Sequence, residues 1–172
     1  LKLLVLKWVQ SLTFNRAQGL IFLTNYAKNT VKLFIRKSQG IDITIPHGLN
    51  KRFSINKKKF YPIRSYTNKK PFRILYVSPI NFYKHQWNVV EAINDLRKNM
   101  RWPIIIDLVG PEYQKNAFNK LNKVIKKLDP KKTWVKYHGK VPYSNLHKIY
   151  SNADLGIFAS TCENIPITLI EM

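Results

Sequence analysis

The chain has 172 residues, of which 45% are hydrophobic and 13% aromatic, and its formal net charge is +21. This composition supplies a folded core and excludes an intrinsically disordered chain, while the charge favours anionic partners such as nucleotides, nucleic acids or an anionic membrane. Cys162 is the only cysteine, which excludes an internal disulfide and a cysteine-based zinc site and agrees with a reducing cytosol.

The two ends of the sequence predict a piece of a longer protein. The chain begins with Leu1 rather than Met, and Met172 falls within what reads as the start of a helix. Residues 1–9 are apolar apart from two lysines, and this run is too short to cross a bilayer. We expect an amphipathic helix there, and we expect the piece by itself to be inactive.

Residues 1–46 alternate between helical and strand patterns, which predicts the last elements of an α/β domain. In chain order we expect a helix to about Phe14, a strand over 19–23, a helix over 26–36 capped by Thr24, and a strand over 41–45. Residues 47–71 are basic, contain no acid and show little periodicity, so we interpret them as an interdomain linker.

Residues 72–172 show the same alternation more clearly. The expected elements are strands over 73–77, 104–109, 134–138 and 155–158, with helices over 86–100, over about 117–128 and after Ser144. Strands and helices that alternate with short connections form right-handed crossovers and a parallel sheet covered on both faces. The predicted fold is therefore α/β, with a doubly wound, Rossmann-like domain after the last elements of another α/β domain.

Any ligand of such a sheet is expected beyond the carboxyl ends of its strands, where helix N-termini also point. The segments at that edge are 78–86, 110–113, 139–143 and 159–166. In the last of them, Glu163 and Glu171 are separated by seven residues, and the amides of Asn164 and Ile165 are expected at a helix start. Carboxylates accept from adjacent sugar hydroxyls, and a helix start favours a phosphate.

The segment over residues 158–172, FASTCENIPITLIEM, resembles the E-x7-E signature of the retaining family 4 glycosyltransferases, which have the GT-B fold. Five further segments are similar to segments of that family's donor domain or to the passage from its acceptor domain into the linker. They are VSPINFYKHQ over 77–86, LVGP over 108–111, YHGKV over 137–141, YSNAD over 150–154 and IPHG over 45–48.

The resemblance implies a role for each matching residue. Glu171 would bind the ribose hydroxyls, Glu163 would meet the donor sugar, and Lys84 would neutralise the departing diphosphate. Amides of Asn164 and Ile165 would contact the diphosphate or the sugar. Other contacts with the nucleotide-sugar donor are expected at the remaining loops, from Ser78, Gly110, Gly139, Lys140 and Val141. The last three would lie near the nucleotide base.

One departure from the family stands in the first loop, which has Ser78 and Pro79 where members often have Gly-Arg. Lys84 is then expected to take over the missing arginine's contact with the phosphates, with His85 or Arg73 as further candidates. The resemblance implies a UDP-sugar as co-substrate, no cofactor, no metal and retention of the anomeric configuration. It also implies a glycan or lipid-linked acceptor and a cytoplasmic protein at the inner face of the membrane.

Two other functions remain open from the residues. The first is nucleic-acid binding, which the charge and the aromatic residues among the cations favour, such as Phe60, Tyr61 and Tyr66. No nucleic-acid motif accompanies them, so we expect no specific nucleic-acid partner. The second is peripheral binding to an anionic membrane, which is compatible with glycosyl transfer to a lipid-linked acceptor.

Overall fold

A computed structural model describes residues 2–35, 40–53 and 61–172 of the chain. It contains two compact units, one formed by Leu1–Gly48 with Glu163–Ile167 and the other by Leu49–Cys162 with Thr168–Met172. Part of the expected linker, together with Phe60 and the end of the helix expected over 26–36, lies outside the described residues. The domain boundaries expected from the sequence stay predictions.

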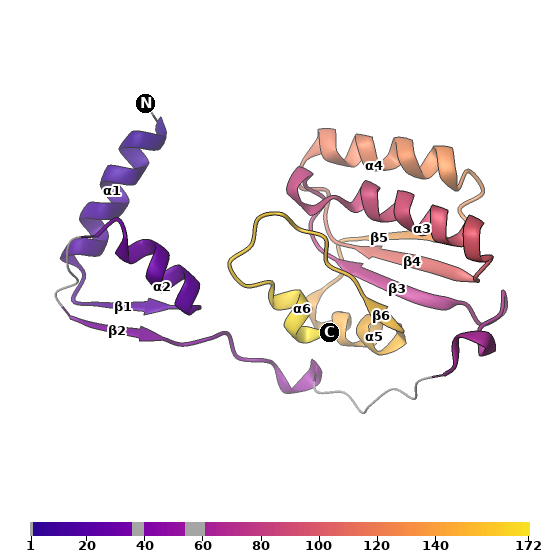
Figure 1. Ribbon diagram of the computed structural model, residues 1–172, viewed down its shortest axis with the longest axis horizontal. Helices are drawn as coiled ribbons and strands as arrows, with labels where there is room; N and C mark the ends of the chain where they lie inside the picture. The colour runs from indigo at the N-terminus through magenta and orange to yellow at the C-terminus, as the bar shows by residue number, and fades with distance from the viewer. Residues whose placement is uncertain (1, 36–39, 54–60) are drawn as a thin grey trace. The chain divides into compact units, whose positions relative to one another are not determined.

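The first unit is a small α/β layer. Its elements are α1 (Lys2–Arg16), β1 (Gly19–Phe22), α2 (Asn25–Lys32) and β2 (Ile41–Thr44), and the two strands pair in parallel (Figure 1). Leu20, Phe22 and Ile35 form its buried core. The expected cap of α2 is confirmed, because the Thr24 hydroxyl oxygen accepts from the Ala27 amide at 3.0 Å.

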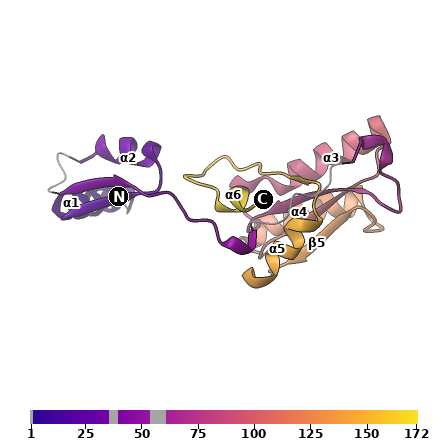
Figure 2. The same cartoon turned by 90° about the horizontal axis from the view of Figure 1, so that it is seen from below.

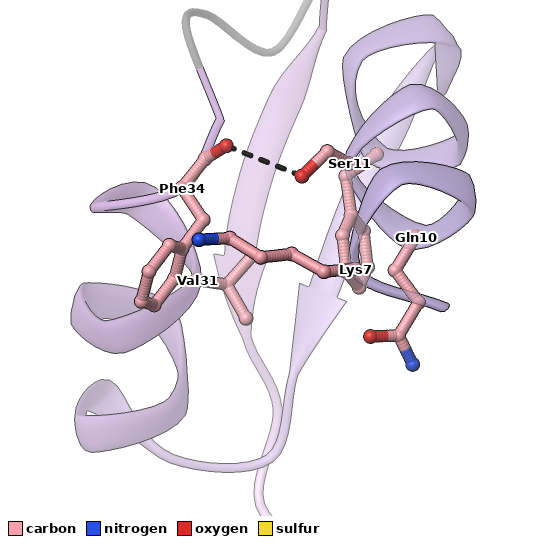
Figure 3. Close-up of a pocket in the computed structure, with 6 residues that line it drawn as sticks. Lys7, Gln10, Ser11, Val31 and Phe34 are labelled. Atoms are coloured by element: carbon pink, nitrogen blue, oxygen red, sulfur yellow. Dashed lines mark hydrogen bonds between the residues drawn. The ribbon is translucent and has the colours of Figure 1, made fainter. Parts of the chain in front are cut away.

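Helix α1 forms as expected, but the amphipathic character predicted for it is wrong. None of its described residues is buried, and apolar side chains are exposed at four consecutive positions, from Leu3 to Leu6. Consecutive positions point around a helix rather than along one face, so no single apolar stripe results. A pocket lies between α1 and α2, where the Lys7 ammonium is 5.0 Å from the centre of the Phe34 ring (Figure 3).

The second unit is built on a four-stranded parallel sheet with the strand order β5-β4-β3-β6. The strands are β3 (Phe72–Val77), β4 (Ile104–Val109), β5 (Val135–Gly139) and β6 (Leu155–Gly156). The helices are α3 (Gln86–Met100), α4 (Lys115–Leu128), α5 (Tyr143–Asn152) and α6 (Ile167–Glu171), with 3-10 turns η1 (Lys51–Phe53), η2 (Ile63–Ser65) and η3 (Phe82–Lys84).

Helices cover both faces of this sheet, as expected for a doubly wound fold. Helices α3 and α4 pack on one face, where Ile74, Tyr76, Ile106 and Leu108 point into the larger core (Figure 1). Helix α5 packs on the other face, which is nearer the viewer in the view from below (Figure 2). The alternate strand residues Leu75, Val77 and Val109 point there, toward Leu146, Tyr150 and Phe53.

The expected elements of this unit agree with the structure in type and order. The main difference is β6, which has two residues rather than the four expected. After Gly156 the backbone makes one more ladder bond, from the Ile157 amide to the Leu75 carbonyl, and Ala159 then bonds to the Tyr76 side chain instead of a neighbouring strand. Among the described residues, no helix combines the length and the apolar composition needed to cross a bilayer.

Candidate functional site

The strand order places a topological switch point between β3 and β6. From β3 the chain proceeds outward through β4 to β5, and it then returns to pair β6 with the opposite side of β3. The connections after β3 and after β6 therefore leave toward different faces of the sheet. In an open parallel sheet, ligands bind in the crevice outside the carboxyl ends of two such strands.

Two segments meet at this switch point and are bonded to each other. The Thr161 amide, after β6, donates to the Tyr83 carbonyl, after β3, at 2.9 Å. The side chains of His85 and Thr161 are joined at 3.1 Å between Nε2 and Oγ1. The Ala159 amide also donates to the Tyr76 hydroxyl at 3.3 Å. These bonds fix the two segments relative to each other within the second unit.

Lys84 lies in this cluster and is buried, with 7% of its surface exposed. Its ammonium is 4.7 Å from the centre of the Phe158 ring and 5.1 Å from that of Tyr83. Its carbonyl accepts the Tyr76 hydroxyl. The aromatic faces stabilise the cation, while its backbone is held at the end of η3. A lysine held in this way presents a positive charge in a fixed position.

The first turn of α3 adds a second positive feature beside Lys84. His85 precedes the helix with φ 52°, in the left-handed region, and its side chain makes no capping hydrogen bond. The N-terminus of a helix of this length attracts anions through its free amides and its dipole. A phosphate group at this point would be met by both the lysine and the helix start.

Ser78 and Gly110 lie where the loops after β3 and β4 meet, and their roles toward a ligand stay predictions. Ser78 is buried, and its hydroxyl donates to the Pro79 carbonyl at 3.2 Å. Gly110 has φ 148°, and a Cβ there would lie 2.0 Å from the Ser78 carbonyl oxygen. Glycine is therefore required for the loops after β3 and β4 to approach each other.

Gln86, which the sequence did not single out, is the first residue of α3 and is 1% exposed. Its Nε2 donates to the Pro79 carbonyl at 2.9 Å, while its Oε1 has no hydrogen-bond partner among the described residues. A buried unpaired acceptor is uncommon because it loses its hydration. It is a polar atom that a bound hydroxyl or amide would satisfy.

Gly139, Lys140 and Val141 follow the edge strand β5. Gly139 has φ 66° and its carbonyl accepts the Gly110 amide at 2.8 Å, while the space where its Cβ would lie is open. Lys140 is exposed, and the half-buried Val141 packs against the α5 side of the core. The backbone here is thus anchored to the loop after β4, and its role toward a nucleotide base stays a prediction.

Glu171 is buried, with 5% of its surface exposed, and two tyrosines of α5 hold its carboxylate. Tyr143 donates to Oε1 at 2.8 Å and Tyr150 donates to Oε2 at 3.0 Å. The two tyrosines are seven residues apart and share one face of the helix, a spacing that the sequence displays but that apolar packing would equally explain. Each carboxylate oxygen keeps a further lone pair for a ligand hydroxyl.

The charge of Glu171 and its hydrogen bonds keep both Tyr143 and Tyr150 protonated. Burial, followed by the charge of Glu171 and the hydrogen bond to it, raises the pKa of Tyr150 strongly. The hydrogen bond to Glu171 is the main cause that raises the pKa of Tyr143. Both hydroxyls therefore remain donors at neutral pH, and they hold the carboxylate in one orientation.

Glu163, Asn164 and Ile165 group with the first unit, not with Lys84 and Glu171. Glu163 and Asn164 are exposed, and the Asn164 Oδ1 accepts the Thr24 hydroxyl at 2.9 Å. Helix α6 begins at Ile167, later than the helix start expected at Asn164 and Ile165. Pro166 explains the delay, because it disfavours helical backbone in the residue before it. The roles of these three residues stay predictions.

Arg73, considered as a substitute for the missing arginine, has a different partner. Its Nη2 lies 2.7 Å and 2.9 Å from the two carboxylate oxygens of Asp107, and His138 Nε2 lies 2.6 Å from Asp107 Oδ1. Arg73 is the second residue of β3, so it stands near the amino end of the strand, opposite the switch point. His85 is the candidate that the structure places at the switch point.

No group of three or more metal-ligating side chains occurs in the described ranges. The second unit has a buried lysine, a helix N-terminus and an oriented glutamate, which suit an anionic ligand that also has hydroxyl groups.

Comparison with known proteins identifies the family. Residues 57–172, about two thirds of the chain, match the model of the family described as glycosyl transferases group 1. The chain belongs to this family. The matched range includes β3 to α6 and thus the whole switch-point cluster. A comparison with curated proteins finds no match.

Several solved structures share the fold of this glycosyl transferases group 1 member. Anabaena Alr3699/HepE in complex with UDP-glucose aligns with a TM-score of 0.75 at 16% identity, over 96% of this chain and 45% of its own. The pneumococcal O-GlcNAc transferase GtfA, in complex with UDP and GlcNAc, aligns with a TM-score of 0.63 at 20% identity, over 90% of this chain and 28% of its own.

A glycosyltransferase from Rickettsia africae aligns with a TM-score of 0.66 at 18% identity, over 91% of this chain and 41% of its own. The chain thus spans between 28% and 45% of the length of these three structures. At these identities the alignments show the fold, which is the GT-B type of α/β architecture expected from the sequence.

Proposed function

We propose that the protein is a retaining glycosyltransferase of family 4 that transfers a sugar from a UDP-sugar to a glycan or lipid-linked acceptor. The observation that supports this most directly is the buried Lys84 at the end of η3, just before α3, at the switch point of a glycosyl transferases group 1 domain. Alr3699/HepE and GtfA, which share the fold, are solved with UDP-glucose and with UDP.

In this proposal Lys84 and the start of α3 bind the diphosphate. Departure of the nucleoside diphosphate from the anomeric carbon adds negative charge to the leaving oxygen. A cation and helix amides that are already in place stabilise that charge without reorganising, which is usually the largest contribution to catalysis. His85 stands beside them and replaces part of the arginine contact that this chain lacks.

Glu171 binds the ribose in the same proposal, with Tyr143 and Tyr150 as positioning residues. Their hydroxyls hold both carboxylate oxygens, so the remaining lone pairs point in set directions. Glu163 and the amides of Asn164 and Ile165 meet the donor sugar, and the backbone at Gly139, Lys140 and Val141 meets the base. The reaction needs no metal or cofactor, because fixed cations supply the charge.

We place the protein in the cytoplasm, at the inner face of the membrane, where a lipid-linked acceptor is reached. The net charge of +21 supports the attraction to an anionic membrane. The same charge would attract nucleic acids, but no observation on the described residues favours a nucleic-acid site over the switch-point crevice.

The test separates the phosphate contact from the ribose contact by titrating the chain with UDP and with uridine. Lys84→Ala should weaken UDP binding by about 1.5 to 3 kcal/mol, roughly 10- to 100-fold, and leave uridine binding nearly unchanged. Glu171→Gln should weaken both ligands, because both contain the ribose. Lys115→Ala, which removes an exposed lysine from the first turn of α4, serves as the matched control.

Circular dichroism of each variant establishes that it is folded before the titration. Equal weakening of UDP and uridine by Lys84→Ala would contradict the phosphate role. UDP binding that neither Lys84→Ala nor Glu171→Gln alters would contradict the site as a whole.

A further inference from the structure

The amino edge of the second unit's sheet, opposite the switch point, has an apolar pocket of about 190 Å³. Its lining comes from η2, the starts of β3 and β4, the end of α3 and β6. The residues that matter most here are Ile63, Phe72, Leu96, Trp102, Ile104 and Leu155. Apart from Tyr66, every residue around it has an apolar side chain or is proline. Such a pocket binds hydrocarbon rather than a sugar or a nucleotide.

Several apolar side chains at and beside the pocket are also accessible from solvent. Ile63 is 51% exposed, Leu96 42% and Leu155 48%. Met100, which ends α3 one turn beyond Leu96, is 49% exposed. The hydrocarbon surface thus continues from the pocket onto the outside of the unit, which is unlike the scattered single apolar residues of an ordinary surface.

Cations concentrate at the same edge for a topological reason. Helices α3 and α4 run antiparallel to the strands, so their last turns lie at the amino ends of β3, β4 and β5. The exposed cations in or just after those turns are Lys98, Arg101, Lys126, Lys127, Lys131 and Lys132. Lys69 and Lys70 immediately precede β3 and are exposed as well.

Acidic groups at this edge do little to neutralise these cations. Asp129 is buried and accepts hydrogen bonds from the amides of Thr133, Trp134 and Val135. Asp154 accepts the Arg73 amide and the Tyr66 hydroxyl. Unlike Asp129 and Asp154, Asp95 near the end of α3 is exposed to solvent. The edge therefore combines an apolar pocket with a strong excess of positive charge.

From this combination we infer that the amino edge of the sheet is a docking surface for an anionic lipid membrane. The cations bind the headgroups, and the pocket with Leu96, Trp102 and Leu155 takes apolar chain from the lipid. Nucleic acid would satisfy the charge alone, because it has no hydrocarbon for the pocket. The inference does not rest on the proposed transfer reaction, since vesicle binding and UDP binding are measured separately.

Vesicle flotation of the full chain tests the docking surface. Vesicles of phosphatidylcholine with phosphatidylglycerol should bind the chain, and vesicles of phosphatidylcholine alone should not. Lys98→Glu/Lys127→Glu should lower the affinity for the anionic vesicles by about tenfold or more. The control Lys115→Glu/Lys120→Glu makes the same charge change in the first half of α4, toward the other edge of the sheet, and it should retain most of the binding. Equal losses in the two double variants would overturn the assignment to this edge.

Fluorescence quenching by brominated lipid tests the apolar part of the surface separately. Phosphatidylglycerol with brominated acyl chains should quench the tryptophan fluorescence of a Trp8→Phe variant, and the further change Trp102→Phe should remove most of the quenching. The other two tryptophans, Trp87 and Trp134, are buried. Leu96→Gln should weaken vesicle binding more than Leu96→Met.

Quenching that persists without Trp102 would show that the acyl chains of the lipid do not enter the pocket, and it would overturn the role assigned to the pocket. Binding to a DNA duplex that Lys98→Glu/Lys127→Glu abolishes, with no binding to anionic vesicles, would overturn the membrane assignment and favour nucleic acid.

Discussion

The two faces of the four-stranded sheet differ in what they bury. On the α3 and α4 face, strand residues such as Ile74, Ile106 and Leu108 pack into one apolar core. On the α5 face, the same strands present Arg73 and Asp107, and α5 presents Tyr150 to Glu171. The α3 and α4 face thus stabilises the unit through apolar burial, whereas the more polar α5 face combines a smaller apolar cluster, around Leu75, Val77 and Val109, with polar side chains held in fixed orientations.

The difference teaches why Glu171 can be buried without destabilising the unit. A buried carboxylate is unfavourable unless donors replace its hydration. Tyr143 and Tyr150 supply those donors, and the apolar core on the opposite face supplies the stability. The comparison predicts that substitutions in the main core destabilise the unit most, whereas removal of a hydroxyl that holds Glu171 mainly alters ligand binding.

The largest loss of stability is expected from Leu121→Ala. Leu121 is fully buried on α4, and removing its side chain leaves a cavity in the main core. The free energy of unfolding should fall by about 3 kcal/mol, as measured by urea denaturation. The control Leu169→Ala, at a half-exposed position on α6, should change it by less than about 0.5 kcal/mol. Comparable losses in both variants would contradict the placement of the core.

Asp129→Ala should destabilise the unit by about 2 kcal/mol, since it leaves the buried amides of Trp134 and Val135 and the partly buried amide of Thr133 without their acceptor. Burial tends to raise the pKa of this carboxyl, but hydrogen bonds from residues 133–135 outweigh it and lower the pKa below its usual range. The stabilisation is therefore present at neutral pH and is lost as the pH falls from about 4 through the folded-state pKa.

Urea denaturation at a series of pH values checks the direction in which the stabilisation by Asp129 changes with pH. The difference in unfolding free energy between the native chain and Asp129→Ala should be constant near pH 7 and should shrink in acid. A difference that grows in acid would contradict the hydrogen-bonding account of Asp129.

Asp107→Ala on the polar face should cost about 1 kcal/mol, less than either change above. Asp107 is buried, but the side chains of Arg73 and His138 are more than a third exposed and are rehydrated by solvent when the carboxylate is removed. UDP affinity should stay within about twofold, because Arg73 lies at the amino end of β3. A large loss of UDP binding would return Arg73 to the site, in contradiction to its position here.

Tyr150→Phe should have a smaller effect on stability and a clear effect on ligand binding. It removes one hydroxyl from Glu171, so we expect a loss of about 0.5 kcal/mol in unfolding free energy and weaker binding of UDP and uridine. The stabilisation from the native tyrosine is complete below about pH 10 and declines at higher pH, since its folded-state pKa is raised. Tyr143→Phe, at an exposed ring, should perturb stability less.

Much of the fold follows from the sequence pattern. The periodicity of Val89, Val90 and Ile93 places α3 correctly, and the apolar run over 104–109 gives β4 with its observed bounds. The shortness of β6 could not be predicted, because the bond from Ala159 to the Tyr76 hydroxyl is a long-range contact. The exposure of α1 was equally hidden, since composition does not say which side chains find a partner.

The candidate site, like the fold, could be predicted from the sequence only in part. The position of Lys84 next to a strand end was predictable, because the carboxyl edge of a parallel sheet is fixed by chain order. The tyrosines that hold Glu171 were not, because their spacing on α5 is also that of ordinary packing residues. The pairing of Arg73 with Asp107 depends on the register of β3 against β4, which the sequence does not state.

The central claim is that a nucleoside diphosphate binds at the switch point between β3 and β6. The most direct measurement is the change in backbone amide NMR shifts of the chain on titration with UDP. The account predicts that saturable changes concentrate in residues 78–86 and 157–161 and at Glu171. Changes that concentrate instead around Ile63, Trp102 and Leu155, at the opposite edge, with none near Lys84, would contradict it.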